Sequence, residues 1–306
     1  MNALELSPGV EWPNMKSQTF KHNIIALVYD FDGTLTPGSM QDYTILPALG
    51  IKPTDFWKKV EKESILTKGE STLTYMRLLL EACERKDYKF TSSELKRLAT
   101  KLRFFQGVAG YFGRMNAFIK KEFRGKISAR HYIISGGLKD IIEATPIAKN
   151  IHRVFACEYY FDKSKRAVFP KVIVNDTLKT QFLFRISKGM ENISENINEH
   201  MPRKDLAIPF QNILYIGDGM TDVPCMAVTK QLGGHSLAVY RPDDPKGLRV
   251  CQSLLGAKRA DFIAKADFRS SSELEKIIKI VIRNMATGIA YRREAFMQQS
   301  VHLYKK

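Results

Sequence analysis

Two aspartates follow an apolar run near the start of the chain, at a spacing that lets them work together. The run Ile24–Tyr29 is β-branched and aromatic enough to predict a buried parallel strand. Asp30 and Asp32 come directly after it, and Gly33 follows them. Open α/β sheets place their active sites at this carboxyl edge. Such a pair can hold a divalent cation, or divide the work between a nucleophile and an acid/base group. The alternative is a solvated Asp-Gly turn, which only partners elsewhere in the chain would exclude.

Two later apolar runs end in polar, glycine-containing turns of the same kind. The run 130–134 predicts a second buried strand, which ends in the sequence SGG, and the run 213–216 predicts a third, which ends in GDGMTD. In a parallel sheet all three turns lie at one edge and can converge on one ligand. Asp218 and Asp222, together with Asp30, then offer carboxylate oxygens of the kind that Mg²⁺ prefers.

Strand and helix patterns alternate from Ile24 onward and predict an α/β fold with a doubly wound, Rossmann-like parallel sheet. Between residues 37 and 105 the apolar spacing is helical throughout, which predicts an inserted all-helical cap. A β-hairpin is expected near residues 151–169, and a last helix is expected to end at Ile282. The expected organisation is an N-terminal arm (1–18), a core (19–36 and 106–283), the helical cap (37–105) and a basic C-terminal tail (284–306).

Composition limits the classes of function. The chain has 306 residues and a formal net charge of +16, which suits anionic partners, although the charge is spread along the chain. No apolar run reaches the roughly 18 residues of a membrane span, and the first residues lack a secretory signal pattern. The four cysteines are scattered, which predicts a reducing, cytoplasmic location and argues against a zinc site or a disulfide framework.

Taken together, these segments resemble the haloacid dehalogenase superfamily of phosphotransferases. The resemblance is carried by DFDGTLT at 30–36, ISGG at 134–137, a lysine that opens a helix at Lys179, and GDGMTD at 217–222. It covers residues 22–268, and the SGG and GDGMTD forms look most like the phosphoserine-phosphatase-like branch. The helical insert corresponds to that superfamily's cap in its first insertion position, the C1-type cap.

The resemblance implies a Mg²⁺-dependent phosphatase that acts on a small phosphorylated substrate. Asp30 resembles the nucleophile that forms an aspartyl-phosphate, and Asp32 resembles the general acid/base, which points to phosphomonoesters. The implied phosphate-binding groups are the Ser135 hydroxyl, the Gly136 N–H and the Lys179 ammonium, with Lys188 on the same helix as a rival. The implied metal ligands are Asp30, the main-chain carbonyl of Asp32, and Asp218, while Asp222 orients waters or Lys179.

One departure and two alternatives stay open. Phosphoserine phosphatases carry a glutamate nine residues past the nucleophile, and here that position is Ser39, so the substrate is not assigned. A phosphomutase or another phosphotransferase would use the same groups. A nucleic-acid-associated or scaffolding protein on this fold, acting through the basic tail, is the less favoured reading, because it would have no need for the aspartates.

Overall fold

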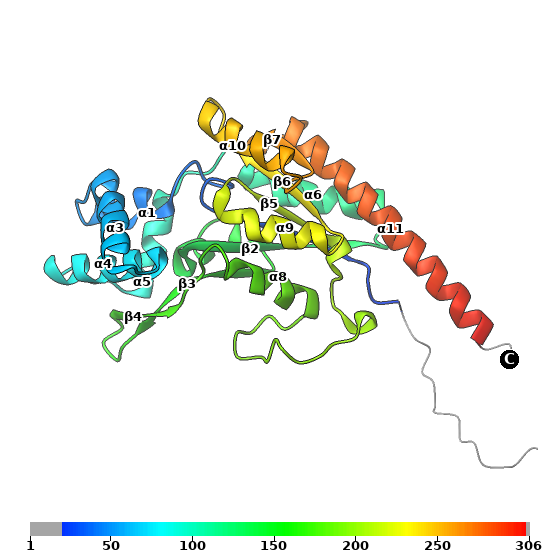
Figure 1. Cartoon of the computed structure of the whole chain (residues 1–306), viewed down its shortest axis with the longest axis horizontal. Coiled ribbons are helices and arrows are strands. Elements are labelled where there is room, and N and C mark those ends of the chain that lie inside the picture. The colour runs from blue at the N-terminus through cyan, green and yellow to red at the C-terminus, as the bar shows by residue number, and fades with distance from the viewer. Residues whose placement is uncertain (1–19, 304–306) are drawn as a thin grey trace, which may run out of the picture.

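A seven-stranded sheet forms the centre of the computed structural model, which describes residues 20–303 (Figure 1). The predicted N-terminal arm over 1–18 lies outside the described residues. The strands are β1 (Ile24–Tyr29), β2 (Ser128–Leu138), β3 (Arg153–Phe161), β4 (Ala167–Val172), β5 (Ile213–Gly217), β6 (His235–Tyr240) and β7 (Phe262–Lys265).

The sheet order is β4-β3-β2-β1-β5-β6-β7, and every neighbouring pair is parallel except the β3–β4 hairpin. Strand β1 lies between β2 and β5, so the chain builds the sheet outward in both directions from β1. This is the topological switch point at which α/β sheets bind ligands. The predicted doubly wound α/β fold and the predicted hairpin are confirmed.

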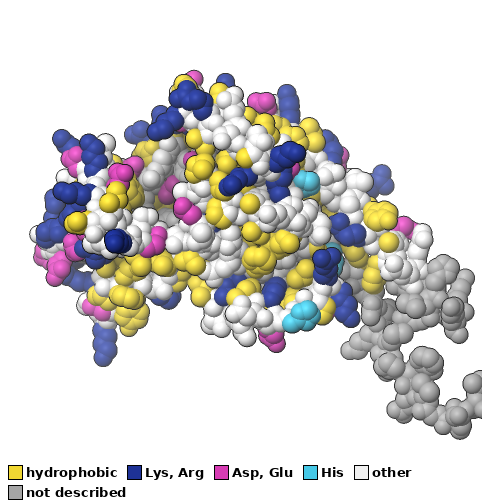
Figure 2. Space-filling model, in the orientation of Figure 1, with side chains coloured by type: hydrophobic (Ala, Val, Ile, Leu, Met, Phe, Trp, Pro, Cys, Tyr) yellow, Lys and Arg dark blue, Asp and Glu magenta, His cyan; other side chains and the backbone are white. Residues whose placement is uncertain are grey.

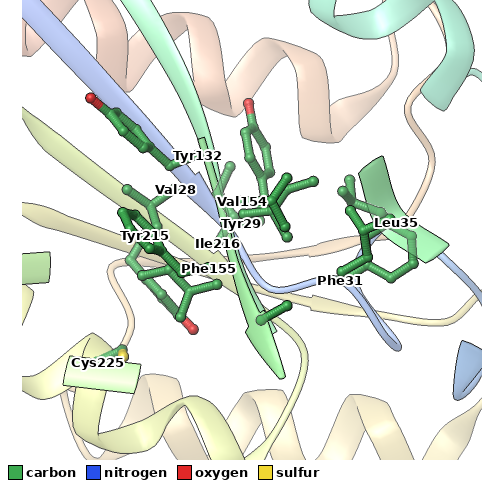
Figure 3. Packing of buried hydrophobic residues seen from close by; sticks show 14 of the residues in the cluster. Val28, Tyr29, Phe31, Leu35, Tyr132, Val154, Phe155, Tyr215, Ile216 and Cys225 are labelled. Atoms are coloured by element: carbon green, nitrogen blue, oxygen red, sulfur yellow. The ribbon is translucent and has the colours of Figure 1, made fainter. Parts of the chain in front are cut away.

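Helices cover both faces of the sheet (Figure 1). On one face, the Tyr29 ring of β1 packs edge-on against Tyr111 and Phe112 of α6 (Val108–Glu122). On the other face, Phe155 of β3 stacks on Phe182 of α8 (Lys179–Lys188) with ring centroids 4.7 Å apart. Figure 3 shows buried side chains of this core, in which Val28 and Tyr29, neighbours on β1, point to opposite faces of the sheet as a pleated strand requires. The core helices are α6 (Val108–Glu122), α7 (Lys139–Glu143), α8 (Lys179–Lys188), α9 (Val223–Gln231), α10 (Pro245–Gly256) and α11 (Glu273–Leu303).

Five helices lie between β1 and α6 and form the cap, at the left of Figure 1: α1 (Met40–Tyr43), α2 (Ile45–Ala48), α3 (Pro53–Thr67), α4 (Ser71–Arg85) and α5 (Ser92–Leu98). The Thr91 side chain caps α5 by accepting a hydrogen bond from the Glu94 N–H. The cap is joined to the β3–β4 hairpin: the Ala167 N–H donates to the Phe90 carbonyl at 2.8 Å, and the Tyr159 hydroxyl donates to the Met76 carbonyl at 2.9 Å. The predicted all-helical cap is therefore present, and it packs against one edge of the sheet.

The expected end of the last helix was wrong. Helix α11 continues from Glu273 to Leu303 instead of stopping at Ile282, because Met285, Ala286 and Ile289 prolong its buried face at helical spacing. Most of the segment expected to be a basic tail is thus helical, and Arg292 donates a hydrogen bond to the Asn212 side chain. Within residues 20–303, no helix combines the length and hydropathy that crossing a membrane requires.

The SGG sequence also differs from the expected turn. Strand β2 runs on through it to Leu138, and the pairing of β2 with β3 shifts register between Ile134 and Leu138. The two glycines therefore form an irregularity at the end of the strand, and such bulges re-aim side chains next to sites.

Two glycines of α6 give a matched test of this architecture. Gly107 precedes the helix with φ +87°, and a Cβ there would overlap the backbone of Phe268 and Arg269. We expect Gly107→Ala to lower the free energy of unfolding by at least about 2 kcal/mol, because both the left-handed backbone and the overlap oppose it. Gly113 is exposed within α6 and has open space, so Gly113→Ala should raise stability by about 0.5–1 kcal/mol. Urea unfolding of both variants checks this, and equal effects of the two substitutions would contradict it.

Candidate active site

The loop that follows β1 brings Asp30 to the neighbouring strand. The Asp30 N–H donates to the Ile216 carbonyl of β5 at 2.9 Å, which continues the strand pairing for one residue. The Gly33 N–H then donates to the Thr36 carbonyl at 2.9 Å and closes a tight loop. Gly33 has φ +84°, and a Cβ there would overlap the Asp218 carboxylate. The glycine thus lets the two aspartate-bearing loops approach each other, which a larger residue would prevent.

A lysine from α8 lies between two aspartates at this edge of the sheet. The Lys179 ammonium donates to Asp30 and to Asp222 at 2.8 Å each, and all three residues are buried. Burial alone would lower the pKa of Lys179, but the Asp222 and Asp30 carboxylates outweigh it and raise that pKa above its usual value. Lys179 therefore stays charged, and its ammonium is fixed beside Asp30.

The rival lysine points elsewhere. The Lys188 ammonium, at the other end of α8, donates to the carbonyls of Ile197 and Glu199 at 2.7 Å each. These carbonyls belong to the 189–209 segment, so Lys188 holds that surface insert against the core. Of the two lysines, Lys179 is the one that the structure places at Asp30.

Both oxygens of the Asp222 carboxylate accept hydrogen bonds from protein groups. One oxygen accepts from Lys179 and from the Tyr215 hydroxyl at 2.7 Å, and the other accepts from the N–H groups of Asp218 and Gly219 at 3.1 and 3.4 Å. Four donors fix this carboxylate in one orientation, which suits the expected role of orienting Lys179. Tyr215 was not foreseen as a site residue, because a tyrosine inside an apolar strand carries no signal that separates it from the core.

Three carboxylates form a group that could hold a cation. Each of Asp30, Asp218 and Asp222 offers one oxygen, and these oxygens lie within 4.8 Å of one another. Burial, and next the charges of Asp30 and Asp222, raise the pKa of the Asp218 carboxyl well above its usual range. A hard divalent cation that prefers oxygen ligands would relieve this repulsion, so the donor set fits Mg²⁺. The Asp32 side chain is not part of this group, which leaves its main-chain carbonyl as the expected ligand.

Asp32 faces a different set of partners. One carboxylate oxygen accepts from the Met40 N–H at 2.9 Å and from the Thr36 hydroxyl at 3.4 Å. Burial, and next the charge of Asp30, raise the pKa of the Asp32 carboxyl well above its usual range. The pKa of Asp30 itself is raised to about 7, mainly by burial, while Lys179 opposes the shift. Two neighbouring aspartates with different partners are the arrangement from which a nucleophile and a proton donor can be made.

The end of β2 brings the predicted phosphate-binding groups beside β1. Tyr29 pairs with Ile133 of β2 and with Ile216 of β5. Asp30 follows Tyr29 by one residue and Ser135 follows Ile133 by two, so both lie at the same edge of the sheet. Ser135 is fully buried, and its hydroxyl oxygen accepts from the Gly137 N–H at 2.9 Å. A Cβ on Gly137 would overlap the Met40 side chain, so this strand end, α1 and Asp32 are in close contact.

The whole arrangement lies where the cap meets the core. Figure 2 shows a hollow between the cap helices on the left and the core, with Asp and Glu side chains around it. All predicted site residues except Lys188 come from the carboxyl ends of β1, β2 and β5 or from the start of α8.

Comparison with known proteins identifies the family. A model described as haloacid dehalogenase-like hydrolase matches residues 27–227. An uncharacterized protein from Borreliella burgdorferi is 30% identical over an alignment of 278 residues, and the match covers 83% of this chain and 95% of that protein.

Solved structures show the same fold. A substrate-bound phosphoserine phosphatase complex superposes with a TM-score of 0.52 at 15% identity, covering 84% of this chain and 98% of the other. A haloacid dehalogenase family hydrolase from Salmonella enterica serovar Typhi gives a TM-score of 0.52 at 16% identity, covering 84% and 74%. The aspartate-bearing loops described above all lie within the matched region, and the chain belongs to the haloacid dehalogenase-like hydrolases.

Proposed function

We propose that this protein is a Mg²⁺-dependent phosphatase that hydrolyses a small phosphomonoester through an aspartyl-phosphate on Asp30. The observation that carries the proposal is the buried Lys179 held between Asp30 and Asp222 at 2.8 Å from each. A fixed cation beside a carboxylate nucleophile stabilises the negative charge on the equatorial oxygens of a phosphoryl group in transfer. The membership in a hydrolase family and the phosphoserine phosphatase fold support the same reaction class.

The reaction would proceed in two steps. An Asp30 oxygen attacks phosphorus, the bond from phosphorus to the ester oxygen breaks, and Asp32 donates a proton to that leaving oxygen. Asp32, now ionised, accepts a proton from water as the water oxygen attacks phosphorus, which releases inorganic phosphate and restores Asp30. Ser135, the Gly136 N–H and Lys179 would hold the phosphoryl oxygens meanwhile.

Mg²⁺ would be held by Asp30, Asp218 and the Asp32 main-chain carbonyl, with Asp222 fixing the surrounding groups. The bound cation would offset the negative charge of Asp30 and of the phosphoryl group, which otherwise repel each other. We further propose a cytoplasmic location, supported by four buried free cysteines within the described residues.

The nucleophile is tested by Asp30→Asn. An amide cannot form the phospho-intermediate, so hydrolysis of p-nitrophenyl phosphate should fall to background while circular dichroism and thermal unfolding still show a folded protein. The matched control is Asp87→Asn, because the Asp87 side chain is 90% exposed on the cap. Turnover by the Asp30 variant at the wild-type rate would refute the mechanism. A phosphorylated acceptor in place of inorganic phosphate would instead indicate the phosphotransferase alternative.

The two lysines of α8 give a second test. Lys179→Met should lower kcat by at least about 100-fold, since it removes the cation that faces the transferring phosphoryl group. It should also lower the Tm, because Asp30 and Asp222 lose their buried partner. Lys188→Met removes the same charge at the far end of the helix and should keep kcat near the wild-type value. Similar kcat values for the two variants would show that Lys179 has no special role.

The requirement for Mg²⁺ is tested by removing the cation with a chelator and then adding it back. Treatment with EDTA should abolish phosphatase activity, and Mg²⁺ should restore it. Asp218→Asn should raise the Mg²⁺ concentration at half-maximal activity by about tenfold or more, because an amide is a weaker ligand than a carboxylate. Calorimetric titration of Mg²⁺ provides a readout that does not depend on turnover. Unchanged Mg²⁺ binding in the Asp218 variant would place the cation elsewhere.

A further inference from the structure

A tyrosine of the cap contacts the proposed phosphate-binding strand end directly. The Tyr75 hydroxyl, on α4, donates a hydrogen bond to the Gly136 carbonyl at 2.7 Å. Tyr75 is only 5% exposed and Gly136 is half-buried, so the bond is partly shielded from water. The bond joins a side chain of the cap to the backbone of the SGG segment, and the two residues are 61 positions apart in the chain.

The Tyr75 hydroxyl contacts the peptide group between Gly136 and Gly137, and the same peptide group also contacts the Ser135 hydroxyl. The Gly136 carbonyl and the Gly137 N–H belong to the same planar peptide unit. The Gly137 N–H donates to the Ser135 hydroxyl oxygen at 2.9 Å. The rigid peptide therefore links Tyr75 and Ser135 through two hydrogen bonds made at opposite edges of one planar unit.

The Ser135 hydroxyl can accept hydrogen bonds through its oxygen and donate one through its hydrogen. Its oxygen already accepts a hydrogen bond from Gly137, and a hydroxyl has a single hydrogen to donate. We propose that Tyr75 is a positioning residue that, through the peptide between Gly136 and Gly137, aims the Ser135 hydroxyl hydrogen at the phosphoryl group. This inference rests on the proposed function, and it assigns the orientation of a phosphate-binding group to the cap.

Tyr75 is itself held in place by aromatic and polar contacts within the cap. The Trp57 ring packs edge-on against it with centroids 5.8 Å apart. The Trp57 indole N–H donates to the Asp42 carboxylate at 2.7 Å. Asp42 belongs to α1, whose first residue, Met40, donates its N–H to Asp32. The same small set of cap contacts thus reaches both the proposed acid/base group and the proposed phosphate-binding segment.

A second tyrosine separates positioning from simple packing. Tyr159 is also buried, and its hydroxyl also donates to a backbone carbonyl across the boundary between cap and core, that of Met76 at 2.9 Å. Its acceptor lies in the cap helix and not in the SGG segment. Loss of either hydroxyl removes one hydrogen bond of similar length, and of the two hydroxyls only that of Tyr75 is linked to Ser135 through a peptide group.

The test compares Tyr75→Phe, Tyr159→Phe and Ser135→Ala, alone and combined. The phenylalanines keep the rings and their packing, so both variants should fold, with similar small losses in Tm. Tyr75→Phe should lower kcat/KM and weaken orthovanadate binding by roughly tenfold, as expected for a misdirected hydrogen bond to a charged group. Tyr159→Phe should change both quantities by less than about twofold if its bond serves packing alone.

The double variant decides the route of the effect. In the Ser135→Ala background, Tyr75→Phe should cause no further loss of kcat/KM, because residues that act through one group are not additive. An undiminished loss in that background, or equal effects of Tyr75→Phe and Tyr159→Phe, would overturn the inference. If the wild-type protein hydrolyses no phosphomonoester, the proposed function fails. Orthovanadate binding, measured by calorimetry, still decides whether Tyr75 acts through Ser135.

Discussion

The buried group formed by Asp30, Lys179 and Asp222 is the interaction on which the rest of this site depends. Removing charges from water is unfavourable by several kcal/mol per ion, and only close pairing with further hydrogen bonds offsets that cost. Here the pairing distances are 2.8 Å, and Tyr215 and two backbone N–H groups satisfy the remaining oxygens of Asp222. Such a group tolerates little displacement, so the strands and the helix that carry it must be held rigidly. The fully buried apolar residues of β1 and β5 provide that rigidity.

The topology makes this convergence possible. Because β1 lies between β2 and β5, the loop after β1 has a strand end on each side, and α8 begins at the same edge. The contacts at Gly33 and Gly137 show how closely these segments pack, since a single added carbon would overlap Asp218 in one case and Met40 in the other. At these two positions a glycine is needed because the backbone lies so close to the Asp218 and Met40 side chains that no Cβ would fit.

Much of this arrangement could be predicted from the sequence, because its signals are local. Apolar runs that end in Asp, Ser and Gly predicted β1, β2 and β5 and the edge at which they meet, and the resemblance to a known family singled out Lys179 at the start of a helix. One miss came from a local signal that the basic residues outweighed, and the other from a contact between distant segments. Helix α11 runs on to Leu303 because its apolar spacing continues past Gly288 and the basic residues, which alone suggested a tail. The bond from Tyr75 to Gly136 joins segments 61 positions apart, and an aromatic residue at helical spacing indicates only a helix core.

Contacts with the β3–β4 hairpin hold the cap against the core. It shares a backbone hydrogen bond with the β3–β4 hairpin at Ala167, a tyrosine bond at Met76, and the edge-on packing of Phe90 against Tyr159. In the sheet order, the hairpin strands that make these contacts lie beyond β2, on the side away from β5. A cap fixed at that edge constrains α4, and α4 in turn carries the hydroxyl that contacts Gly136. The cap is thus connected to the end of β2 through α4 and the hydrogen bond from Tyr75 to Gly136. Because Tyr75 is part of α4, a displacement of α4 would stretch or break its hydrogen bond to the Gly136 carbonyl.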